Sequence, residues 1–420
     1  MINKKISHKR TNCRLCLSED IELVIEMGKS PISEKYVVQK ELSTVIPKVS
    51  INLYYCKNCK HIQMLDVVNP DYLWSNFTFK TSRDEKLINH FDKYAKEVLE
   101  FEQMDKESLI LDIGSNDGTM LNSFKKLGFE NILGIDPAEE IVKEANARGI
   151  KTIQGYFNKQ TAKDILTKYG KPKVIIANNV FAHVDDLREM LQSIKSIMDE
   201  KTIYVFEVSY LLDVIKKMLI GTIFHEHLCY HSIISLNSFF ESFGLKLTKI
   251  KRGPEQGGSI ICYSALKEKI SKTHESVQEL INLEKEQKLD QIETYKKFNK
   301  TLFSLKSDLI ESIKKINTQG GKISGFGAAR AGTTFLSYFE IGKYISKLYD
   351  DNEYKHFKYS PGDQIQVLPT NKILNDMPDY LVIFAWIHAD KIIEDYKDYL
   401  NKGGAFIKFY PKLEIIKKNI

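Results

Sequence analysis

Four short apolar runs between residues 109 and 208 constrain the fold of this 420-residue chain more than any other feature. Their sequences are LILDIG, NILGID, KVIIANNV and TIYVFEV, at residues 109–114, 131–136, 173–180 and 202–208. Each has the length and continuous hydrophobicity of a strand that is buried on both faces of a parallel sheet. Helix-like stretches separate the first three runs, and another precedes the fourth. This alternation predicts an α/β domain with a doubly wound, Rossmann-like sheet.

The segments on either side of these runs predict further domains. Residues 83–103 have the apolar spacing of an amphipathic helix, and the strongly charged stretch from Tyr263 to about Ile316 predicts one or two long, mostly exposed helices. A second α/β pattern follows, with strands expected at 322–329, 345–350, 380–386 and 405–410. We therefore expect an N-terminal module at residues 1–82 and a central α/β domain at 83–265. A helical linker with a second α/β domain is expected at 266–420.

Composition and charge exclude several classes of protein. The chain has 61 basic and 55 acidic residues and a net charge of +6, without a basic tract interleaved with aromatic residues, so we expect no nucleic-acid partner. A mild positive field still suits a phosphorylated small molecule. No run approaches 18 apolar residues, and the N-terminus lacks the apolar stretch of a signal peptide. We expect a cytoplasmic protein without a membrane segment, either a monomer or a homodimer.

Four of the six cysteines lie near the N-terminus in two C-x-x-C pairs, Cys13 with Cys16 and Cys56 with Cys59. Four thiolates are the ligand set of a structural zinc site, and a closed four-sulfur site leaves no position open for catalysis. Glycine is absent from both pairs, so Asn12 and Asn58 are expected to supply the turn conformations. Unliganded buried cysteines are the alternative, but the matched spacing favours a small zinc-binding module.

The first apolar run leads into a glycine-containing loop, Gly114–Gly118, and then into a helix. Glycines let the backbone approach a ligand closely, and a helix N-terminus offers free N–H groups. The G-x-G-x-x-G pattern of a pyrophosphate loop is absent, and Asp112 and Asp117 stand beside the glycines instead. Carboxylates suit a cofactor with a cationic amino group and a sulfonium better than one with phosphates. The loop therefore favours S-adenosylmethionine over a nicotinamide cofactor.

The ends of the next strands carry polar residues where a doubly wound sheet places its ligand. Asp136 ends the second run and is placed to accept hydrogen bonds from ribose hydroxyls; a solvated acid in a turn before Pro137 is the alternative. The third run ends in NNVFAHV, which includes His183. The predicted cofactor-binding residues are Asp112, Gly114, Asn116, Asp117, Gly118, Asp136, Pro137, Asn178 and Asn179.

The C-terminal half contains a second glycine cluster between a strand and a helix. Its glycine spacing does not fit G-x-G-x-x-G, which weakens an NAD-binding interpretation, and a tight turn without a ligand is an equal alternative. Arg330 in this turn, with Lys355 and Lys358 further on, is expected to contact a diphosphate, since arginine suits bidentate phosphate contacts.

Several motifs together match a known family. They are CRLC and CKNC near the N-terminus, LDIGSNDG, IIANNVFAHV, FHEHLCYHS at 224–232, QGGSI at 256–260, FGAARAGTTFLSY at 326–338 and DDNEYKHFKYSPG at 350–362. On these motifs the chain resembles the sugar C-methyltransferases that act on nucleotide-linked deoxysugars in antibiotic and surface-polysaccharide pathways. The resemblance covers nearly the whole chain. It implies an N-terminal zinc domain, a central methyltransferase domain and a C-terminal domain that helps to hold the sugar nucleotide.

The resemblance also implies a mechanism in which a base removes the proton beside a keto group of the sugar, and the enolate attacks the sulfonium methyl. The family's base matches His227, its glutamate matches Glu226, and its strand-end histidine matches His183. His225 is a further catalytic candidate, because in an extended segment positions 225 and 227 share one face with 226 opposite.

This sequence departs from the family at three positions. Phe224 stands where members carry a tyrosine, Phe79 aligns with another family tyrosine, and Gln256 replaces a histidine. We expect Phe79 and Phe224 to contact the substrate, but neither side chain has a hydroxyl that could hydrogen-bond to it. Two alternatives stay open: O- or N-methylation of a sugar or related metabolite, and a catalytically reduced binding protein on the same scaffold. Retention of Glu226 and His227 argues against the second.

Overall fold

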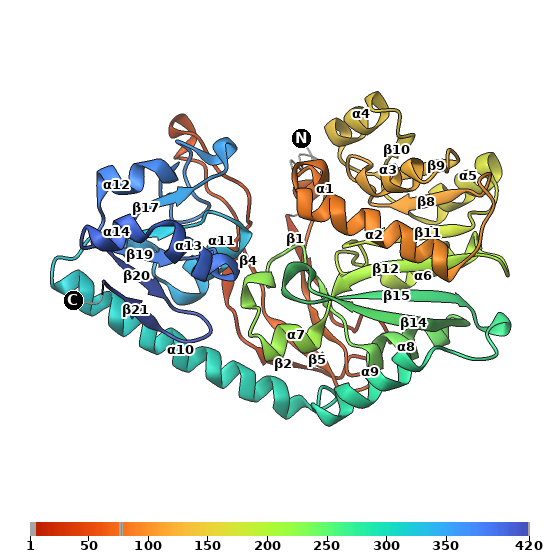
Figure 1. The fold of residues 1–420 in the computed structure, drawn as a ribbon. Helices are drawn as coiled ribbons and strands as arrows, with labels where there is room; N and C mark the ends of the chain where they lie inside the picture. The colour runs from red at the N-terminus through yellow and green to blue at the C-terminus, as the bar shows by residue number, and fades with distance from the viewer. Residues whose placement is uncertain (1–5, 75–76, 78, 419–420) are drawn as a thin grey trace.

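The computed structural model describes residues 6–74, 77 and 79–418 of the chain. These residues form two α/β lobes with a small β-rich module at their junction, and one long helix runs along the outside of the molecule beneath the junction and the C-terminal lobe (Figure 1). Within the described ranges, no helix is long and apolar enough to cross a membrane.

The central lobe contains a seven-stranded sheet in the order β10-β9-β8-β11-β12-β15-β14, in which the first five strands are parallel. β15 and β14 extend it antiparallel. The strands are β8 (Ile110–Ile113), β9 (Ile132–Asp136), β10 (Thr152–Gln154), β11 (Val174–Asn178), β12 (Ile203–Ser209), β14 (Leu245–Gly253) and β15 (Ser259–Leu266). The four apolar runs form β8, β9, β11 and β12, which confirms the predicted doubly wound fold. β10, β14 and β15 lie outside the predicted strands.

Helices cover both faces of this sheet, as the buried strands require. On one face, α2 (Glu85–Phe101) and α3 (Thr119–Lys126) share a buried cluster with Ile110 and Val174. α2 matches the predicted amphipathic helix, and it begins after Asp84, whose carboxylate accepts hydrogen bonds from the first-turn N–H groups of Lys86 and Leu87. The other helices of the lobe are α4 (Glu139–Ala147), α5 (Lys159–Tyr169), α6 (Leu187–Ser196), α7 (Leu211–Lys216) and α8 (Ile233–Ser242).

The N-terminal module contains three small sheets and the helix α1 (Pro70–Trp74). Its largest sheet has the order β13-β6-β5-β2, and β13 (Cys229–Tyr230) comes from the central part of the chain. The module's own strands are β1 (Ser7–Lys9), β2 (Ile21–Ile25), β3 (Lys29–Pro31), β4 (Lys48–Ser50), β5 (Leu53–Cys56), β6 (Ile62–Met64) and β7 (Asp66–Val68). The sheet is therefore completed only by residues far beyond position 82.

The predicted charged stretch forms two helices, α9 (Glu275–Glu286) and α10 (Ile292–Thr318). One face of α10 is apolar and buried, with Tyr295, Leu302 and Leu309, while its charged residues face outward. Tyr55 of β5 donates a hydrogen bond to the carbonyl of Asp290, between the two helices, at 2.6 Å. The long helix thus contacts the N-terminal module as it leads to the C-terminal lobe (Figure 1).

The C-terminal lobe is built on a six-stranded sheet in the order β18-β17-β16-β19-β20-β21, parallel except for β21. The strands are β16 (Ile323–Phe326), β17 (Ile345–Asp350), β18 (Val367–Pro369), β19 (Tyr380–Ile383), β20 (Ala405–Lys408) and β21 (Glu414–Ile416). The helices are α11 (Arg330–Phe339), α12 (Ile373–Asp376), α13 (Ala389–Asp395) and α14 (Lys397–Asn401). The four predicted strands form β16, β17, β19 and β20, so this lobe is a second doubly wound domain.

Candidate active site and metal centre

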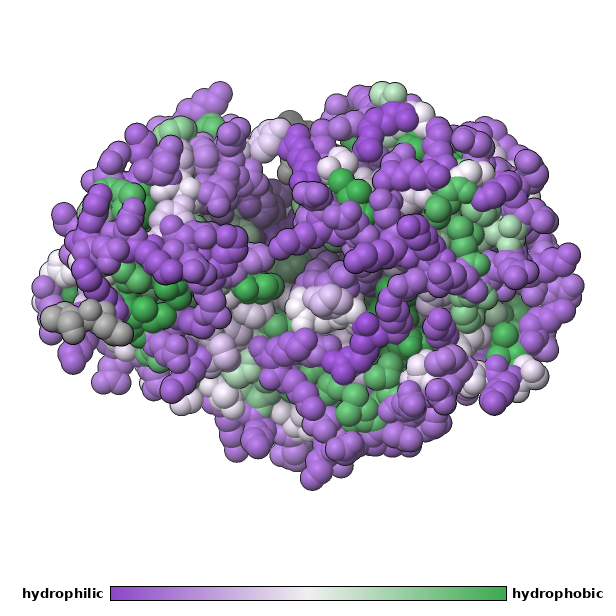
Figure 2. All heavy atoms as spheres, in the orientation of Figure 1, coloured by the Kyte–Doolittle hydropathy of each residue, from purple (hydrophilic) through white to green (hydrophobic). Residues whose placement is uncertain are grey.

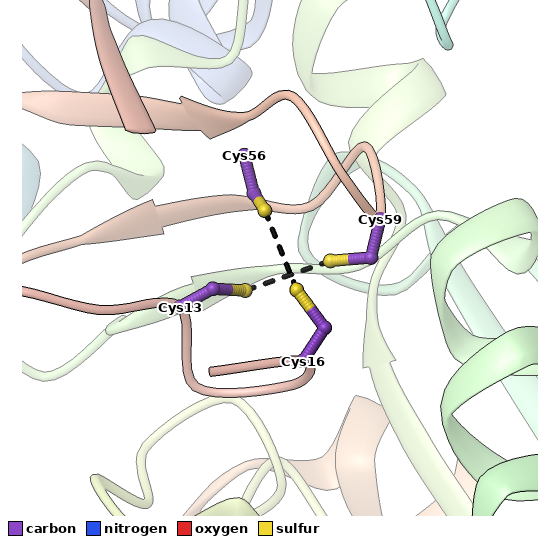
Figure 3. Close-up of side chains that lie close together, drawn as sticks. All are labelled: Cys13, Cys16, Cys56 and Cys59. Carbon is purple, nitrogen blue, oxygen red and sulfur yellow. Dashed lines mark hydrogen bonds between the residues drawn. The ribbon is translucent and has the colours of Figure 1, made fainter. Parts of the chain in front are cut away.

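The four N-terminal cysteines converge on one point in the module (Figure 3). The Sγ atoms of Cys13 and Cys59 lie 3.5 Å apart, as do those of Cys16 and Cys56, and all four sulfurs lie within 4.8 Å of one another. Sulfurs bound tetrahedrally to zinc at about 2.3 Å lie about 3.8 Å from each other. The donor set and its spacing therefore fit one structural zinc ion with no open coordination position.

Both cysteine pairs form the same kind of turn. The N–H of Leu17 donates to the carbonyl of Cys13 at 3.0 Å, and the N–H of Lys60 donates to the carbonyl of Cys56 at 2.9 Å. Leu17 and Lys60, each directly after the second cysteine of its pair, have φ values of 63° and 66°. The left-handed residues are therefore these two, and the expectation that Asn12 and Asn58 supply the turn conformations is wrong.

The predicted cofactor loop joins β8 to α3, with Gly114 at φ 72° and Gly118 at φ 79°. A Cβ at Gly114 would lie 2.3 Å from a methyl of Val180, and one at Gly118 would lie 2.5 Å from a methyl of Ile150. Both glycines are thus required by backbone conformation and close packing. The Oδ2 of Asp136, at the end of β9, accepts a hydrogen bond from the N–H of Asn116 at 3.0 Å.

The acidic and amide side chains of this loop bind within the protein. Asn116 Oδ1 accepts hydrogen bonds from the N–H and hydroxyl of Thr81, at 3.0 and 3.1 Å, and Asp117 accepts from the N–H of Ser82 at 3.0 Å. Asp112 is buried, and burial together with the charge of Asp136 raises its pKa well above the usual range. Asn116 and Asp117 therefore fasten residues 81 and 82 over the loop, a contact that the sequence pattern did not reveal.

Polar atoms without partners mark the carboxyl edge of the central sheet. Among the residues that the structure describes, the buried side-chain nitrogen of Asn178, at the end of β11, has no hydrogen-bond partner, and neither does the hydroxyl of Ser115 in the glycine loop. The other amide atom of Asn178 accepts a hydrogen bond from Tyr94 at 3.0 Å. Asn179 follows with φ 55°. Polar groups left open beside Asp136 at this edge fit a ligand with hydroxyl and amino groups, as S-adenosylmethionine has.

Two histidines from different segments stack against each other beside this edge. The rings of His183 and His227 have centroids 5.1 Å apart, with Trp74 on the other side of His183 and Phe224 4.1 Å from His227. Residues 224–227 form a turn closed by the N–H of His227 and the carbonyl of Phe224, so the expected extended segment is wrong. The turn sends the three charged or ionisable side chains of HEH in different directions.

The protonation state of His227 follows from its surroundings. Its Nδ1 donates a hydrogen bond to the carbonyl of Thr222 at 2.7 Å, so Nε2 carries the lone pair, and among the described residues this lone pair is free. Burial lowers the pKa of His227 to about 4, and the charge of Arg330 adds to this. Burial and the nearby His227 lower the pKa of His183 as well. Both imidazoles are therefore neutral near pH 7.

Glu226 is where three parts of the chain meet. Its carboxylate forms an ion pair with Nε of Arg330, at the start of α11, at 3.2 Å, and accepts the hydroxyl of Ser33, from the N-terminal module, at 3.4 Å. Glu226 is 6% exposed, and burial raises its pKa against the opposing charge of Arg330. The guanidinium also lies over the rings of Phe77 and Phe224, at 5.2 and 5.8 Å.

The other predicted residues lie around this centre or apart from it. His225 faces away: its Nε2 donates to the carbonyl of Val49 on β4 at 3.0 Å, so it holds the N-terminal module. Lys355 pairs with Glu34 at 3.0 Å and donates to the carbonyl of Ala328 at 2.9 Å. Lys358 is half-buried. The side chain of Phe79 is 44% exposed, and its carbonyl accepts a hydrogen bond from the side chain of Asn116 in the cofactor loop.

The surface is hollowed between the two lobes, with mostly hydrophilic side chains around the opening (Figure 2). The lobes also touch directly, because Arg83, just before α2, donates a hydrogen bond to the hydroxyl of Tyr354 in the C-terminal lobe at 2.8 Å. Trp74 and Ser33 are site residues that sequence reasoning missed. The only signal for them is their position in the N-terminal module, which does not reveal that the module reaches the central lobe.

Comparison with known proteins agrees with this architecture. Three family models match successive segments: a zinc binding domain at residues 13–74, a methyltransferase domain at 87–250 and a C-methyltransferase C-terminal domain at 254–411. The chain is an S-adenosylmethionine-dependent methyltransferase. S-adenosylmethionine is the cofactor of its central lobe, and structural zinc belongs to its N-terminal module.

Among relatives of this methyltransferase is the C-methyltransferase NovU of Streptomyces niveus, which is 27% identical over 405 residues, 96% of each chain. Solved structures match more weakly. The magnesium protoporphyrin IX methyltransferase of Synechocystis PCC 6803 is 16% identical over 45% of this chain and 89% of its own, with a TM-score of 0.33. The CcbJ methyltransferase of Streptomyces caelestis is 12% identical over 42% and 89%, with a TM-score of 0.34. TM-scores this low carry no conclusion about function.

Proposed function

We propose that this enzyme methylates a carbon of a nucleotide-linked keto-deoxysugar through an enolate, with His227 as the base. The observation that carries the proposal is the state of His227, a neutral imidazole with a free Nε2 lone pair beside a buried glutamate and an arginine. A general base must be unprotonated at working pH and within reach of the proton it removes.

In this mechanism, Nε2 of His227 takes the proton from the carbon next to the keto group, and the C–H electrons form the enolate. When bound, S-adenosylmethionine would supply an electrophilic methyl group, which bonds to the enolate carbon as its bond to the sulfonium sulfur breaks and S-adenosylhomocysteine is left. The carbonyl of Thr222 holds Nδ1–H of His227, so the imidazolium that forms keeps its orientation and is stabilised by that hydrogen bond. The proton then passes from Nε2 to solvent.

The enolate oxygen requires a positive or hydrogen-bonding partner. Phe224 and Phe79 have no hydroxyl for this, whereas Arg330 lies over the ring of Phe224 and is partly exposed, with 28% of its side chain accessible. We assign the oxyanion to Arg330, with Glu226 orienting its guanidinium. The diphosphate is assigned to the C-terminal lobe, where Lys355 and Lys358 follow β17.

The test is incubation of the zinc-loaded protein with methyl-labelled S-adenosylmethionine and a panel of nucleotide-linked keto-deoxysugars, followed by mass spectrometry. In heavy water, carbon transfer through an enolate exchanges the proton next to the keto group. His227→Gln should lose both methylation and exchange, while His274→Gln, at an exposed histidine before α9, should keep them.

An O-methyl or N-methyl product without exchange at carbon would contradict carbon transfer and favour methylation of a hydroxyl or amine instead. Binding of the sugars without any product would support a binding protein on this scaffold.

A further inference from the structure

Arg14 stands between two of the zinc-ligating cysteines, Cys13 and Cys16, and its side chain is completely buried. A buried guanidinium is costly unless it is paired and hydrogen-bonded. Nη1 of Arg14 contacts Oε1 of Gln63 at 3.2 Å and donates to the carbonyl of Met64, and Nε forms an ion pair with Asp185 at 3.2 Å. The side chain of Arg14 thus connects the zinc turn to two other segments of the chain.

The first connection leads to the segment that carries His183. Asp185 comes two residues after that histidine and also pairs with Arg10 at 3.1 Å and with His8 at 3.1 Å. Arg188, further along, donates to the carbonyl of Leu15, inside the first cysteine pair, at 2.7 Å. The loop after β11 is therefore fastened to the zinc turn by several charged contacts.

The second connection leads to the segment that carries His227. Gln63 and Met64 belong to β6, which pairs with β13, and the N–H of Met64 donates to the carbonyl of Leu228 at 2.9 Å. The N–H of Cys229 in turn donates to the carbonyl of Ala182 at 3.1 Å. The segments that carry His183 and His227 are thus hydrogen-bonded to each other. Arg14 contacts Asp185 in the first segment and Met64, which is bonded to the second.

We propose that Arg14 is a positioning residue, through which the zinc turn sets the relative placement of His183 and His227. The inference rests on the proposed function, in which His227 is the base. A shift of about 1 Å at reacting groups is enough to cost roughly 100-fold in rate. A purely structural role for Arg14 predicts lower stability only. A positioning role predicts slower turnover in protein that is folded, zinc-loaded and able to bind the cofactor.

The experiment compares Arg14→Gln, Arg14→Lys and Asp185→Asn in the full-length, zinc-loaded enzyme. We expect one zinc per chain, unchanged S-adenosylmethionine affinity and a kcat at least 10-fold lower in Arg14→Gln and Asp185→Asn. The kcat of Arg14→Lys should be intermediate, because one ammonium cannot reach both Asp185 and the carbonyl of Met64. The matched control is Lys57→Gln in the second cysteine turn. Within the described ranges, the ammonium of Lys57 pairs with Asp20 and Glu22 alone, at the surface, so kcat should not change.

Two further readouts separate positioning from stability. The double variant Arg14→Gln/Asp185→Asn should lose less kcat than the two single losses combined, since both substitutions remove the ion pair between Arg14 and Asp185. Ring signals of His183 and His227 in histidine-labelled protein should move in Arg14→Gln and stay in place in Lys57→Gln, whatever the acceptor.

A lower melting temperature with unchanged kcat and unmoved ring signals would overturn the inference. If the ring signals move but the wild-type enzyme methylates no nucleotide-linked sugar, positioning stands and the proposed function fails.

Discussion

The two α/β lobes share one framework and use its first loop differently. In each lobe the strand order begins 3-2-1-4-5 by position in the chain, and the acid ending the second strand accepts a backbone N–H from the first loop. Asp136 accepts from Asn116 at 3.0 Å, and Asp350 accepts from Ala328 at 2.6 Å.

The difference lies in what surrounds each loop. Around the central loop, Asn178 and Ser115 have buried polar atoms that find no hydrogen-bond partner in the described part of the chain. Around the C-terminal loop, Tyr36 and Lys355 both donate to the carbonyl of Ala328, and Arg330 reaches out to Glu226. The same framework thus leaves polar atoms open at one loop, while the other loop contacts the N-terminal module and, through Arg330, Glu226 of the central part of the chain.

The largest expected effect concerns the base. His227→Ala should lower kcat about 100- to 10,000-fold, the usual cost of losing a general base, with cofactor affinity unchanged. Because the pKa of His227 is about 4 and the neutral form is the base, kcat/KM should be flat near neutral pH and fall only as pH drops towards 4. Pre-steady-state and pH–rate measurements test this. A low-pH limb above 6 would rule out His227 in its described environment.

The next-largest effect is expected at Arg330, and it tests whether the C-terminal loop belongs to the catalytic centre. Arg330→Gln should lower kcat roughly 100-fold, the cost of losing one oxyanion-stabilising group, and leave cofactor affinity unchanged. Arg330→Lys should recover part of the rate because it keeps the charge. Steady-state kinetics with a nucleotide-linked keto-sugar provide the measurement. A higher KM with an unchanged kcat would assign Arg330 to the diphosphate and break the proposed division between the loops.

The two strand-end acids give a matched pair of variants. Asp136→Ala should weaken S-adenosylmethionine binding by about 1–3 kcal/mol, because charge-assisted hydrogen bonds to the ribose are lost. Asp350→Ala, in the corresponding position of the other lobe, should leave that affinity unchanged. Titration calorimetry measures the S-adenosylmethionine affinity of both variants. Equal losses would show that the C-terminal loop also holds the cofactor.

The smallest effect concerns the fifth strand of each sheet. In the central lobe, His90 pairs with the buried Glu207 at 2.7 Å and with Glu255 at 3.0 Å. Burial alone lowers the pKa of His90, but the hydrogen bond and charge of Glu207 outweigh it, and the pKa is raised overall. In the C-terminal lobe, Lys408 pairs with an exposed Asp390.

A raised pKa means that the charged pair stabilises the folded state fully below pH 6.5 and loses that contribution as pH rises through the folded-state value. The free energy of unfolding of wild type, measured by denaturant titration, should therefore exceed that of His90→Gln at pH 6 by on the order of 1 kcal/mol, and this difference should shrink by pH 9. Lys408→Gln should show no such trend over this range. A margin that grows with pH would contradict the assignment of His90 as an imidazolium.

The sequence predicts the framework well, because buried parallel strands have a local signature. β8 and β9 are buried along their whole length, and each is an apolar run with a single aspartate, Asp112 in β8 and Asp136 at the end of β9. β14 has exposed charged residues along one end, including Lys251 and Arg252, so no such run marks it. The cysteine pairs were equally visible because zinc ligation has a fixed spacing.

The candidate site was only partly predictable. The motif containing Glu226 and His227 is local, but the partners that define it, Ser33 and Arg330, lie far away in sequence and meet it only through tertiary packing. The direction of His225 also escaped prediction, because a single hydrogen-bonded turn replaces the extended geometry. The assignments of individual cofactor and substrate contacts remain predictions.

The strand β13 has a consequence for how this protein is made. β5 pairs with one edge of β6, but the other edge has no partner until Cys229 and Tyr230 have been synthesised and brought back to it. At about 5–20 residues per second, the ribosome delivers them roughly ten to thirty seconds after β6. During that interval an unpaired strand edge is exposed on the nascent chain, which is the kind of surface that chaperones protect. An isolated N-terminal fragment would keep that edge permanently.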